Sequence, residues 1–402
     1  MAIDPATDPW KGFNLFENRR EIHQDLYPII NRIRDTAPVW KTPIGIWIVS
    51  RYDDVERLLK HTAAGVRTRA GVLPSMRPRP PDHPRDVFML SNDPPVHTRL
   101  RRLVQQAFTP RALQGIAATV ERVVAECLDA IADRDEVDLV EALALPVPSI
   151  VICEMMGVPQ EDRARFTRWT AEATHDLQLL PPPELAARAD AASFALAAYF
   201  RDLIARRRDD LRDDILSGLI GAAQDGGLTE PELVSQAIGL LIAGFETTIG
   251  GIALGVRTLL RHPDQLARLR AEPALIKPAV EECLRYDTSI PMTLRLLHEE
   301  AEFGGERLPV DTAVVGLIAA AQRDPAAYPD PDTFDITRDG RPILAFGGGI
   351  HHCLGAHLAR MEMQTAILAL VQRFDDLQLV GDELELGRSL FRVPERMLLR
   401  RG

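Results

Sequence analysis

Apolar residues recur at the three- and four-residue spacing of amphipathic helices along most of this chain. Pro181, Pro182 and Pro183 separate two of these segments, because proline ends one helix and can open the next. A β-branched and aromatic run at 44–50 instead predicts a short strand. The predicted helices cover residues 27–36, a segment that starts at Asp53, 110–132, 146–156, 161–180, 183–208, 229–261 and 354–370.

The longest predicted helix spans residues 229–261. Thr229, Pro231 and Glu232 form its start, with a threonine cap, an early proline and a glutamate three residues after the cap. His262-Pro263 ends it. Its middle is apolar on nearly every side, which is typical of a buried helix.

Polar residues interrupt this apolar stretch at Glu246, Thr247 and Thr248, and one phenylalanine separates them from the small residues Ala243 and Gly244. Burying a carboxylate and hydroxyl groups is unfavourable by several kcal/mol unless they have hydrogen-bond partners. The spacing leaves two interpretations open. One is a helix kink with an internally satisfied polar cluster, and the other is a site with a chemical role.

A glycine-rich segment leads to Cys353, directly before the helix predicted at 354–370. Glycines 347–349 allow the backbone to lie flat against a large group. A cysteine at a helix N-terminus faces unpaired N–H groups and the positive end of the helix dipole, which favour its thiolate. Such a thiolate suits a soft metal centre. A structural cysteine before an ordinary amphipathic helix is the alternative.

This segment resembles the haem-binding loop of the cytochrome P-450 family, whose pattern is Phe-Gly-x-Gly-x-His-x-Cys-x-Gly. The chain carries every fixed residue of the pattern, namely Phe346, Gly347, Gly349, His351, Cys353 and Gly355. The resemblance implies haem b (iron protoporphyrin IX) as cofactor and Cys353 as its axial thiolate ligand, which favours O–O cleavage. It also implies a mainly α cytochrome P-450 fold, with a large helical domain and a small β-rich region.

The same resemblance gives the polar residues of the long helix a catalytic role. Glu246 and Thr247 match the family's acid–alcohol pair, which organises a water chain that delivers protons during oxygen activation. Ala243 and Gly244 are small, so they would leave room for oxygen and substrate beside the haem.

Four further residues are implied as anchors of the haem propionates. His97 and Arg101 lie four apart, so on a helix they share one face, which suits an anionic partner. The resemblance identifies that anion as a propionate and adds Arg295 and His351. Four cationic or hydrogen-bonding groups are proportionate to two carboxylates.

Arg99 and Arg102 predict an exposed charged face on the same segment. A sharper hypothesis is that they help to dock an acidic ferredoxin. The resemblance implies that electrons come from NAD(P)H through a ferredoxin and ferredoxin reductase, because 402 residues leave no room for a further redox domain.

Glu282 and Arg285 match the structural Glu-x-x-Arg signature of the family, and Arg338 is the candidate that completes it. The residues expected to line the substrate site are nearly all apolar, which predicts a hydrophobic substrate. They are Phe88, Leu90, Leu240, Ile290, Met292, Thr293 and Phe391.

Composition narrows the classes of protein. A net charge of −11 argues against a nucleic-acid-binding protein. We expect neither a signal peptide at the N-terminus nor a segment with the roughly 20 apolar residues that cross a membrane, hence no membrane anchor. The mixed-charge run 206–214 predicts a solvated surface. The cysteines lack disulfide or metal-site spacing, which favours the cytoplasm; they are Cys127, Cys153, Cys283 and Cys353.

These features predict one cytochrome P-450 domain over residues 1–402. Its β-rich part is expected mainly at about 38–60 and 290–400, and its helical part at about 90–285 and 354–372. The predicted function is that of a bacterial, cytoplasmic haem-thiolate monooxygenase. It would insert one atom of O₂ into a hydrophobic small molecule such as a fatty acid, terpenoid, steroid or polyketide.

Three alternatives stay open from the sequence. A peroxide-driven hydroxylase or an isomerase could use the same fold. A haem-binding sensor without turnover would not need the acid–alcohol pair. A zinc site is the third, although neighbouring residues rarely converge on one tetrahedral ion. Its ligands would come from His351, His352, Cys353 and His357.

Overall fold

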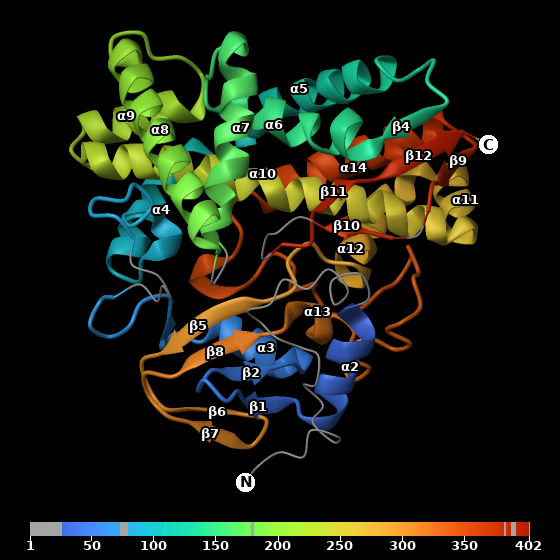
Figure 1. Cartoon of the computed structure of the whole chain (residues 1–402), viewed down its shortest axis with the longest axis horizontal. Coiled ribbons are helices and arrows are strands. Elements are labelled where there is room, and N and C mark those ends of the chain that lie inside the picture. Colours follow the sequence, from blue (N-terminus) through green and yellow to red (C-terminus); the bar gives the residue numbers. More distant parts are fainter. Residues whose placement is uncertain are drawn as a thin grey trace. The chain divides into compact units, whose positions relative to one another are not determined.

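The computed structural model describes residues 26–72, 79–108, 110–177, 181–381, 383–386 and 391–401 (Figure 1). The chain forms two compact units. Unit 1 comprises Met1–Val72, Gly250–Cys353 and Phe374–Gly402. Unit 2 comprises Leu73–Ile249 and Leu354–Arg373.

The centre of unit 1 is a five-stranded sheet in the order β1-β2-β8-β5-β3. β2 and β8 run parallel, whereas the other neighbouring strands are antiparallel. The strands are β1 (Val39–Lys41), β2 (Trp47–Val49), β3 (Ala64–Gly65), β5 (Thr293–Leu297) and β8 (Ala313–Gly316).

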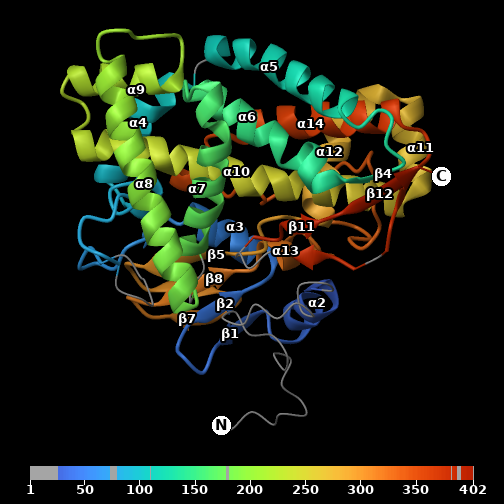
Figure 2. The same cartoon turned by 45° about the horizontal axis from the view of Figure 1, so that its top comes forward.

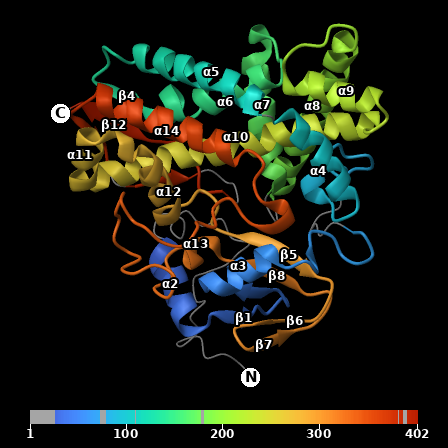
Figure 3. The same cartoon turned by 180° about the vertical axis from the view of Figure 1, so that it is seen from behind.

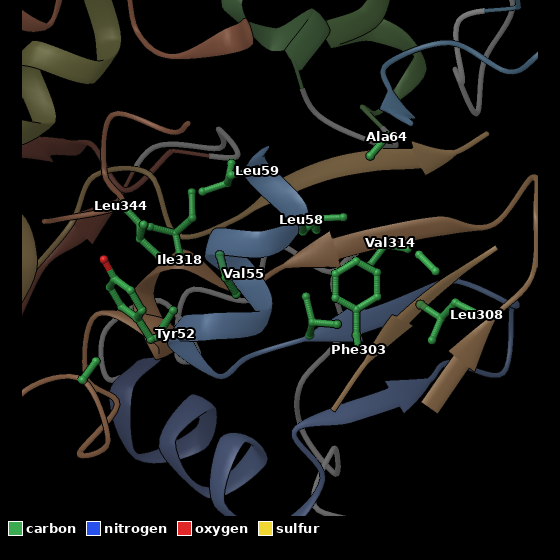
Figure 4. Close-up of a cluster of buried hydrophobic side chains, with 14 of the residues drawn as sticks. Tyr52, Val55, Leu58, Leu59, Ala64, Phe303, Leu308, Val314, Ile318 and Leu344 are labelled. Atoms are coloured by element: carbon green, nitrogen blue, oxygen red, sulfur yellow. The ribbon is translucent and has the colours of Figure 1, made fainter. Parts of the chain in front are cut away.

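Helices cover both faces of this sheet, because successive side chains of a strand point to opposite faces. Val314 joins a core under α3 (Tyr52–Lys60), together with Phe303 (Figure 4). Val315, the next residue, joins a second core with α2 (Leu26–Thr36). Acidic residues in the first turn of α3 and basic residues in its last turn complement the helix dipole.

The rest of unit 1 consists of short elements and the C-terminal part of the long helix α10 (Glu230–Arg261). β6 and β7 form an antiparallel hairpin, and β9 pairs with β12. These elements are α11 (Pro263–Ala271), η5 (Pro273–Leu275), α12 (Ile276–Tyr286), β6 (Ala301–Phe303), β7 (Glu306–Leu308), α13 (Ile318–Ala321), η6 (Gly349–His351), β9 (Leu377–Leu379), β10 (Glu385–Leu386), β11 (Pro394–Arg396) and β12 (Leu398–Arg401).

Unit 2 is almost entirely helical. α7 packs along α8, and α14 lies along α5 although more than 200 residues separate them (Figures 2 and 3). Besides the N-terminal part of α10, its elements are η1 (Met89–Ser91), α4 (Val96–Ala107), α5 (Pro110–Asp129), β4 (Glu136–Asp138), the π-helix η2 (Val140–Ala144), α6 (Pro146–Met155), η3 (Gln160–Asp162), α7 (Arg163–Thr174), η4 (His175–Leu177), α8 (Pro183–Arg207), α9 (Ile215–Gln224) and α14 (Ala356–Arg373).

The predicted start of α10 is confirmed. Thr229 Oγ1 accepts a hydrogen bond from Glu232 N over 3.4 Å, and Glu232 Oε2 accepts one from Thr229 N over 2.9 Å. These two bonds form a reciprocal capping box. The mainly α fold class with small sheets is also confirmed.

Two expectations need correction. α10 does have the length and apolar composition of a membrane span, but 78% of its most apolar window is buried inside the structure, as in a core helix. The run 206–214 is not wholly solvated, because Arg207 is buried and forms an ion pair with Asp214. Asp214 also accepts a hydrogen bond from Ser217 N and so caps α9.

The strand predicted at 44–50 is real but shorter, since β2 covers Trp47–Val49. The helix predicted at 161–180 is regular only as α7, with a 3₁₀ turn at each end. Residues 178–180 lie outside the described residues. Apolar periodicity locates these elements, whereas their ends depend on local hydrogen bonding.

Glu362 on α14 generates a prediction about stability. It is fully buried, and desolvation raises the pKa of its carboxyl from 4.5 to about 8. Below pH 4.5 the carboxyl is neutral in folded and unfolded chains. As the pH rises toward 8, only the unfolded chain ionises, so the folded state loses stability relative to it.

We therefore expect Glu362→Gln to match the parent protein near pH 4 and to be more stable near pH 8, by on the order of 3 kcal/mol. Thermal unfolding at both pH values measures this. Glu306→Gln, on an exposed position of β7, is the control and should show no such divergence. Equal stability of Glu362→Gln and the parent at both pH values would refute the prediction.

Candidate functional site

Backbone hydrogen bonds shape the cysteine loop of unit 1. Cys353 N donates to Phe346 O over 2.9 Å and thereby closes the loop. Within it, Gly347 N donates to Leu344 O over 2.9 Å. The half-buried His351 lies in the single 3₁₀ turn η6. Backbone hydrogen bonds within the loop therefore help to fix its shape up to the cysteine.

Two glycines of this loop occupy the left-handed region, with φ of +69° at Gly347 and +61° at Gly349. A Cβ at Gly349 would lie 2.5 Å from the carbonyl oxygen of Leu59, at the end of α3. A side chain here would therefore clash with backbone. The fixed glycine at 349 thus has a steric reason, namely the close approach of the loop to α3.

Cys353 differs from the other cysteines, all of which the structure describes. It is exposed, and α14 begins three residues later at Ala356. Burial raises the pKa of Cys127 to about 11 and that of Cys153 to about 12, and it also raises the pKa of the fully buried Cys283 thiol. Those three remain thiols at neutral pH, whereas Cys353 is accessible to a ligand.

Gln322 fixes the base of the loop and was missed in the sequence. Its Oε1 accepts hydrogen bonds from Leu344 N over 2.9 Å and from Ala345 N over 3.0 Å. Its Nε2 donates to Leu284 O of α12 over 2.9 Å. The signal in the sequence was weak: one amide directly after the apolar run 317–321. A buried amide with all these bonds is a strong positional constraint.

The Glu-x-x-Arg residues form a buried network next to Gln322. Glu282 accepts two hydrogen bonds from Arg285, over 2.6 and 2.8 Å. Arg285 also donates to Gln322 O over 2.9 Å. Arg338 donates to Glu282 Oε1 over 3.2 Å and to three backbone carbonyls at 329–333. Arg338 is thus the arginine that contacts this pair.

Arg295 lies buried on β5 of unit 1. It donates hydrogen bonds to Thr293 Oγ1 over 2.9 Å and to Leu294 O over 2.8 Å. Met292 packs against the core of α2, as does Leu294. Thr293 and Arg295 therefore present the other face of the strand.

Phe391 and Ile290 are two candidates far apart in sequence, and each lies next to a residue of a bonded pair. Arg392 binds Asp287 through its guanidinium, and its backbone N donates to Ser289 O over 2.8 Å. Both charged side chains are buried. The segments on either side, 287–290 and 391–393, are therefore held to each other within unit 1.

In unit 2, His97 and Arg101 lie on α4. His97 is 1% exposed, whereas Arg101 is half-buried. Burial, and after it the Arg101 guanidinium, lower the pKa of His97. A neutral imidazole still donates one hydrogen bond, so the pair offers an anion one neutral and one charged donor.

Glu246 and Thr247 lie on α10, within unit 2, and both are half-buried. Thr247 Oγ1 donates to Ala243 O over 3.0 Å, one turn earlier. Thr174 Oγ1 of α7 lies 2.8 Å from Glu246 Oε1. Thr174 was missed, because nothing in a sequence pairs one threonine of α7 with a residue 72 positions away.

Phe88 is seated against α10. A Cβ at Gly239 would lie 2.2 Å from its ring. Gln236 holds the neighbouring backbone, accepting from Met89 N over 3.2 Å and donating to Val87 O over 3.0 Å. Leu240, the next residue of α10 after Gly239, is buried as well. Gln236 and Gly239 were both missed in the sequence.

Among the other candidates of unit 2, Leu90 is more exposed than expected, and Arg99 is less exposed than expected. Leu90 is 40% exposed, whereas Phe88 is buried, so Phe88 is the better candidate for an apolar contact with the substrate. Arg102 is exposed, whereas Arg99 is not free in solvent: it forms an ion pair with Glu232 and donates to Gly227 O over 2.7 Å.

The chain was compared with known proteins. The family model Cytochrome P-450 matches residues 9–395. 6-Deoxyerythronolide B hydroxylase of Saccharopolyspora erythraea is 40% identical over 389 residues, 92% of this chain and 94% of that protein. The chain belongs to the cytochrome P-450 family. Vitamin D(3) 25-hydroxylase of Pseudonocardia autotrophica is 37% identical, over 93% of this chain and 94% of the relative.

Solved structures agree with the P-450 fold. The crystal structure of P-450BioI, in complex with an acyl carrier protein ligated to hexadec-9Z-enoic acid, superposes with a TM-score of 0.89 at 34% identity. The match covers 95% of this chain and all of that one. The expected fold is confirmed.

As a cytochrome P-450, the protein is an oxidoreductase of the monooxygenase class whose cofactor is haem b with an axial cysteine thiolate. The residues present fit this group: an exposed cysteine follows a loop with left-handed glycines. Among the described residues, apart from its chain neighbours, none comes within 4 Å of the position of a Cβ at Gly355. Within the described residues no group of three potential ligands could hold a metal ion, which argues against the zinc site.

The close contact between the Phe88 ring and Gly239 of α10 leads to a prediction about stability. In Gly239→Ala the new methyl group would overlap the Phe88 ring, so we expect a loss of about 1–3 kcal/mol in the free energy of unfolding. Gly221→Ala is the matched control, since its Cβ meets no atom within 4 Å and alanine favours the helix α9. Thermal unfolding compares the two. The prediction fails if Gly239→Ala is as stable as the control.

Proposed function

We propose that this cytochrome P-450 inserts one oxygen atom from O₂ into a hydrophobic small molecule, with Cys353 as the axial ligand of its haem. The observation that carries the proposal is the closed loop before Cys353. Its hydrogen bonds and left-handed glycines present an exposed thiol, whereas the other cysteines are less exposed and their pKa values are raised by burial.

The bound haem would supply oxygen activation, strengthened by electron donation from the thiolate. Around it, the chain provides donors for the two propionates. Unit 1 provides the guanidinium of Arg295 and the imidazole of His351, and unit 2 provides His97 and Arg101. Phe346, Gly347 and Gly355 would help the cysteine loop to hold the haem, and the small residues Ala243 and Gly244 would leave room for oxygen and substrate.

Glu246 and Thr247 move the protons that the reaction consumes. The hydroxyl of Thr247 donates its proton to Ala243 O, and a hydroxyl oxygen that donates can also accept a hydrogen bond from water. Glu246 can take a proton from solvent and pass it to that water, because a carboxyl group both donates and accepts. An intact pair favours O₂ over peroxide as the oxidant.

The substrate is hydrophobic and held by few polar groups. Phe88, Leu240, Ile290, Thr293 and Phe391 carry this part of the proposal. The relatives are named for 6-deoxyerythronolide B and vitamin D(3), and the structural neighbour carries a fatty acyl group. We therefore assign the substrate to long or polycyclic lipid-like compounds, including fatty acids, terpenoids, steroids and polyketides.

Three further properties belong to the proposal. The two units act as one P-450 domain, since the family model spans both. A ferredoxin and its NAD(P)H-dependent reductase supply the electrons. The protein works in the cytoplasm, in keeping with a core helix α10 that is mostly buried.

The proposal is tested by turnover under heavy-isotope dioxygen with a surrogate ferredoxin and reductase, using a panel of long-chain fatty acids, steroids and macrolactones. Compounds that shift the spin state of the haem are carried forward. We expect a product that contains one heavy oxygen atom. Incorporation of oxygen from water, or no product from any compound that shifts the spin state, would overturn it.

Thr247→Ala should keep haem binding but release most reducing equivalents as hydrogen peroxide, because water loses its hydrogen-bond partner. We expect a several-fold larger peroxide yield per NAD(P)H with a long-chain fatty acid. Thr258→Ala is the control: Thr258 lies on the same helix and donates to Leu254 O over 2.8 Å, also one turn earlier. Equal coupling of Thr247→Ala and this control would rule out the role of Thr247.

A further inference from the structure

The hydroxyl of Thr174, at the end of α7, lies within hydrogen-bond distance of two oxygen atoms but can donate only one proton. Its Oγ1 lies 2.7 Å from Ala171 O and 2.8 Å from Glu246 Oε1. Its side chain is fully buried, with no exposed surface. All three residues belong to unit 2, so the geometry lies within one compact body.

The hydrogen-bond chemistry of these three groups is constrained. A backbone carbonyl only accepts, and a hydroxyl donates a single proton while it can accept others. If Thr174 donates to Glu246, the carboxyl group is ionised or presents its unprotonated oxygen. If Thr174 donates to Ala171 O, a protonated Glu246 can donate to Thr174 Oγ1. Both arrangements use the same heavy-atom positions.

We propose that Thr174 is a positioning residue for Glu246 that holds the carboxyl group in one place through both of its protonation states. Rotation of one hydroxyl switches between the two arrangements. In the first, the proton of Thr174 points to the carboxylate. In the second, the carboxyl proton points to Thr174 Oγ1, and the hydroxyl proton points to Ala171 O.

A neutral hydroxyl and a cationic side chain would affect the two protonation states of Glu246 differently. An arginine or lysine would favour only the carboxylate, so each protonation of Glu246 would break an ion pair. A hydroxyl can form a hydrogen bond with both the acid and its anion, because it can donate or accept. Glu246 can then gain and lose a proton repeatedly without moving away from Thr247, its neighbour on α10.

This inference rests on the proposed role of Glu246 in proton delivery, and it adds a residue of another helix to that role. The buried Thr174 would be the fixed point, and Glu246 the group that changes its charge. Thr174→Val removes the hydroxyl and keeps the shape of the side chain. Thr174→Ser restores a hydroxyl and should rescue the native behaviour.

Thr170 provides a matched control. It lies one turn earlier on α7, is also buried, and donates its hydroxyl to Phe166 O over 2.8 Å. Thr170→Val therefore removes a back-bonded hydroxyl from the same helix without changing any bond to Glu246. Thermal unfolding and the spectrum of the reduced carbon-monoxide complex show that each variant is folded and has bound its haem.

The first measurement is infrared spectroscopy of the carboxyl bands in the resting holoprotein, with Glu246→Gln used to identify the band of Glu246. We expect Thr174→Val to shift this band, whereas Thr174→Ser and Thr170→Val leave it in place. An unshifted band in Thr174→Val, or the same shift in Thr170→Val, would overturn the proposal. This readout needs no turnover, so it stands apart from the proposed reaction.

The second measurement is the rate of NADPH oxidation with a surrogate ferredoxin and reductase and no added substrate, in light and heavy water. We expect Thr174→Val to be several-fold slower and to show a larger solvent isotope effect than the parent and Thr170→Val. Unchanged rates in Thr174→Val would contradict the positioning role. Unchanged rates in Glu246→Gln would instead refute the proposed function of Glu246. The infrared shift would still show whether Thr174 forms a hydrogen bond with Glu246.

Discussion

The buried amide of Gln322 is the constraint on which the cysteine loop depends. It binds two successive N–H groups at the base of the loop and a carbonyl of α12 at the same time. α12 in turn carries Glu282 and Arg285, and Arg285 returns to Gln322 O. A loop rich in glycine has much conformational entropy to lose, so it needs such a network to hold one shape. Removing any member would leave buried polar groups without partners, which is unfavourable.

α10 differs from the buried Gln322 network, because its side chains Glu246 and Thr247 are only partly buried. Its apolar surface makes it a core helix, yet Glu246 and Thr247 introduce polar groups that are only half-buried. Thr247 is satisfied by its own helix, whereas Glu246 has a partner on α7. The helix therefore gives a rigid position to groups whose hydrogen bonds can change. Gln236 and Gly239, slightly earlier on the same helix, fix the neighbouring segment with Phe88.

Much of this could be predicted from the sequence. Helical periodicity located α2, α3, α5, α6, α8, α10 and α14, and the capping box fixed the start of α10 to the residue. The glycine and cysteine positions were readable because they match a family pattern of fixed spacing, and Gly347 and Gly349 do have left-handed φ values. Gln322, Thr174, Gln236 and Arg392 were not, because their roles depend on partners brought close only by the fold. Arg207 was misjudged for the same reason, since its charge is neutralised in the core by Asp214.

The identity of the axial ligand is tested most directly by the absorption spectrum of the reduced, carbon-monoxide-bound holoprotein. We expect the strongly red-shifted Soret band that thiolate ligation produces. The band should disappear in Cys353→Ser and persist in Cys127→Ser, whose thiol is partly buried and has a raised pKa. A parent protein without the red shift, or a Cys353→Ser variant that keeps it, would contradict the assignment of Cys353.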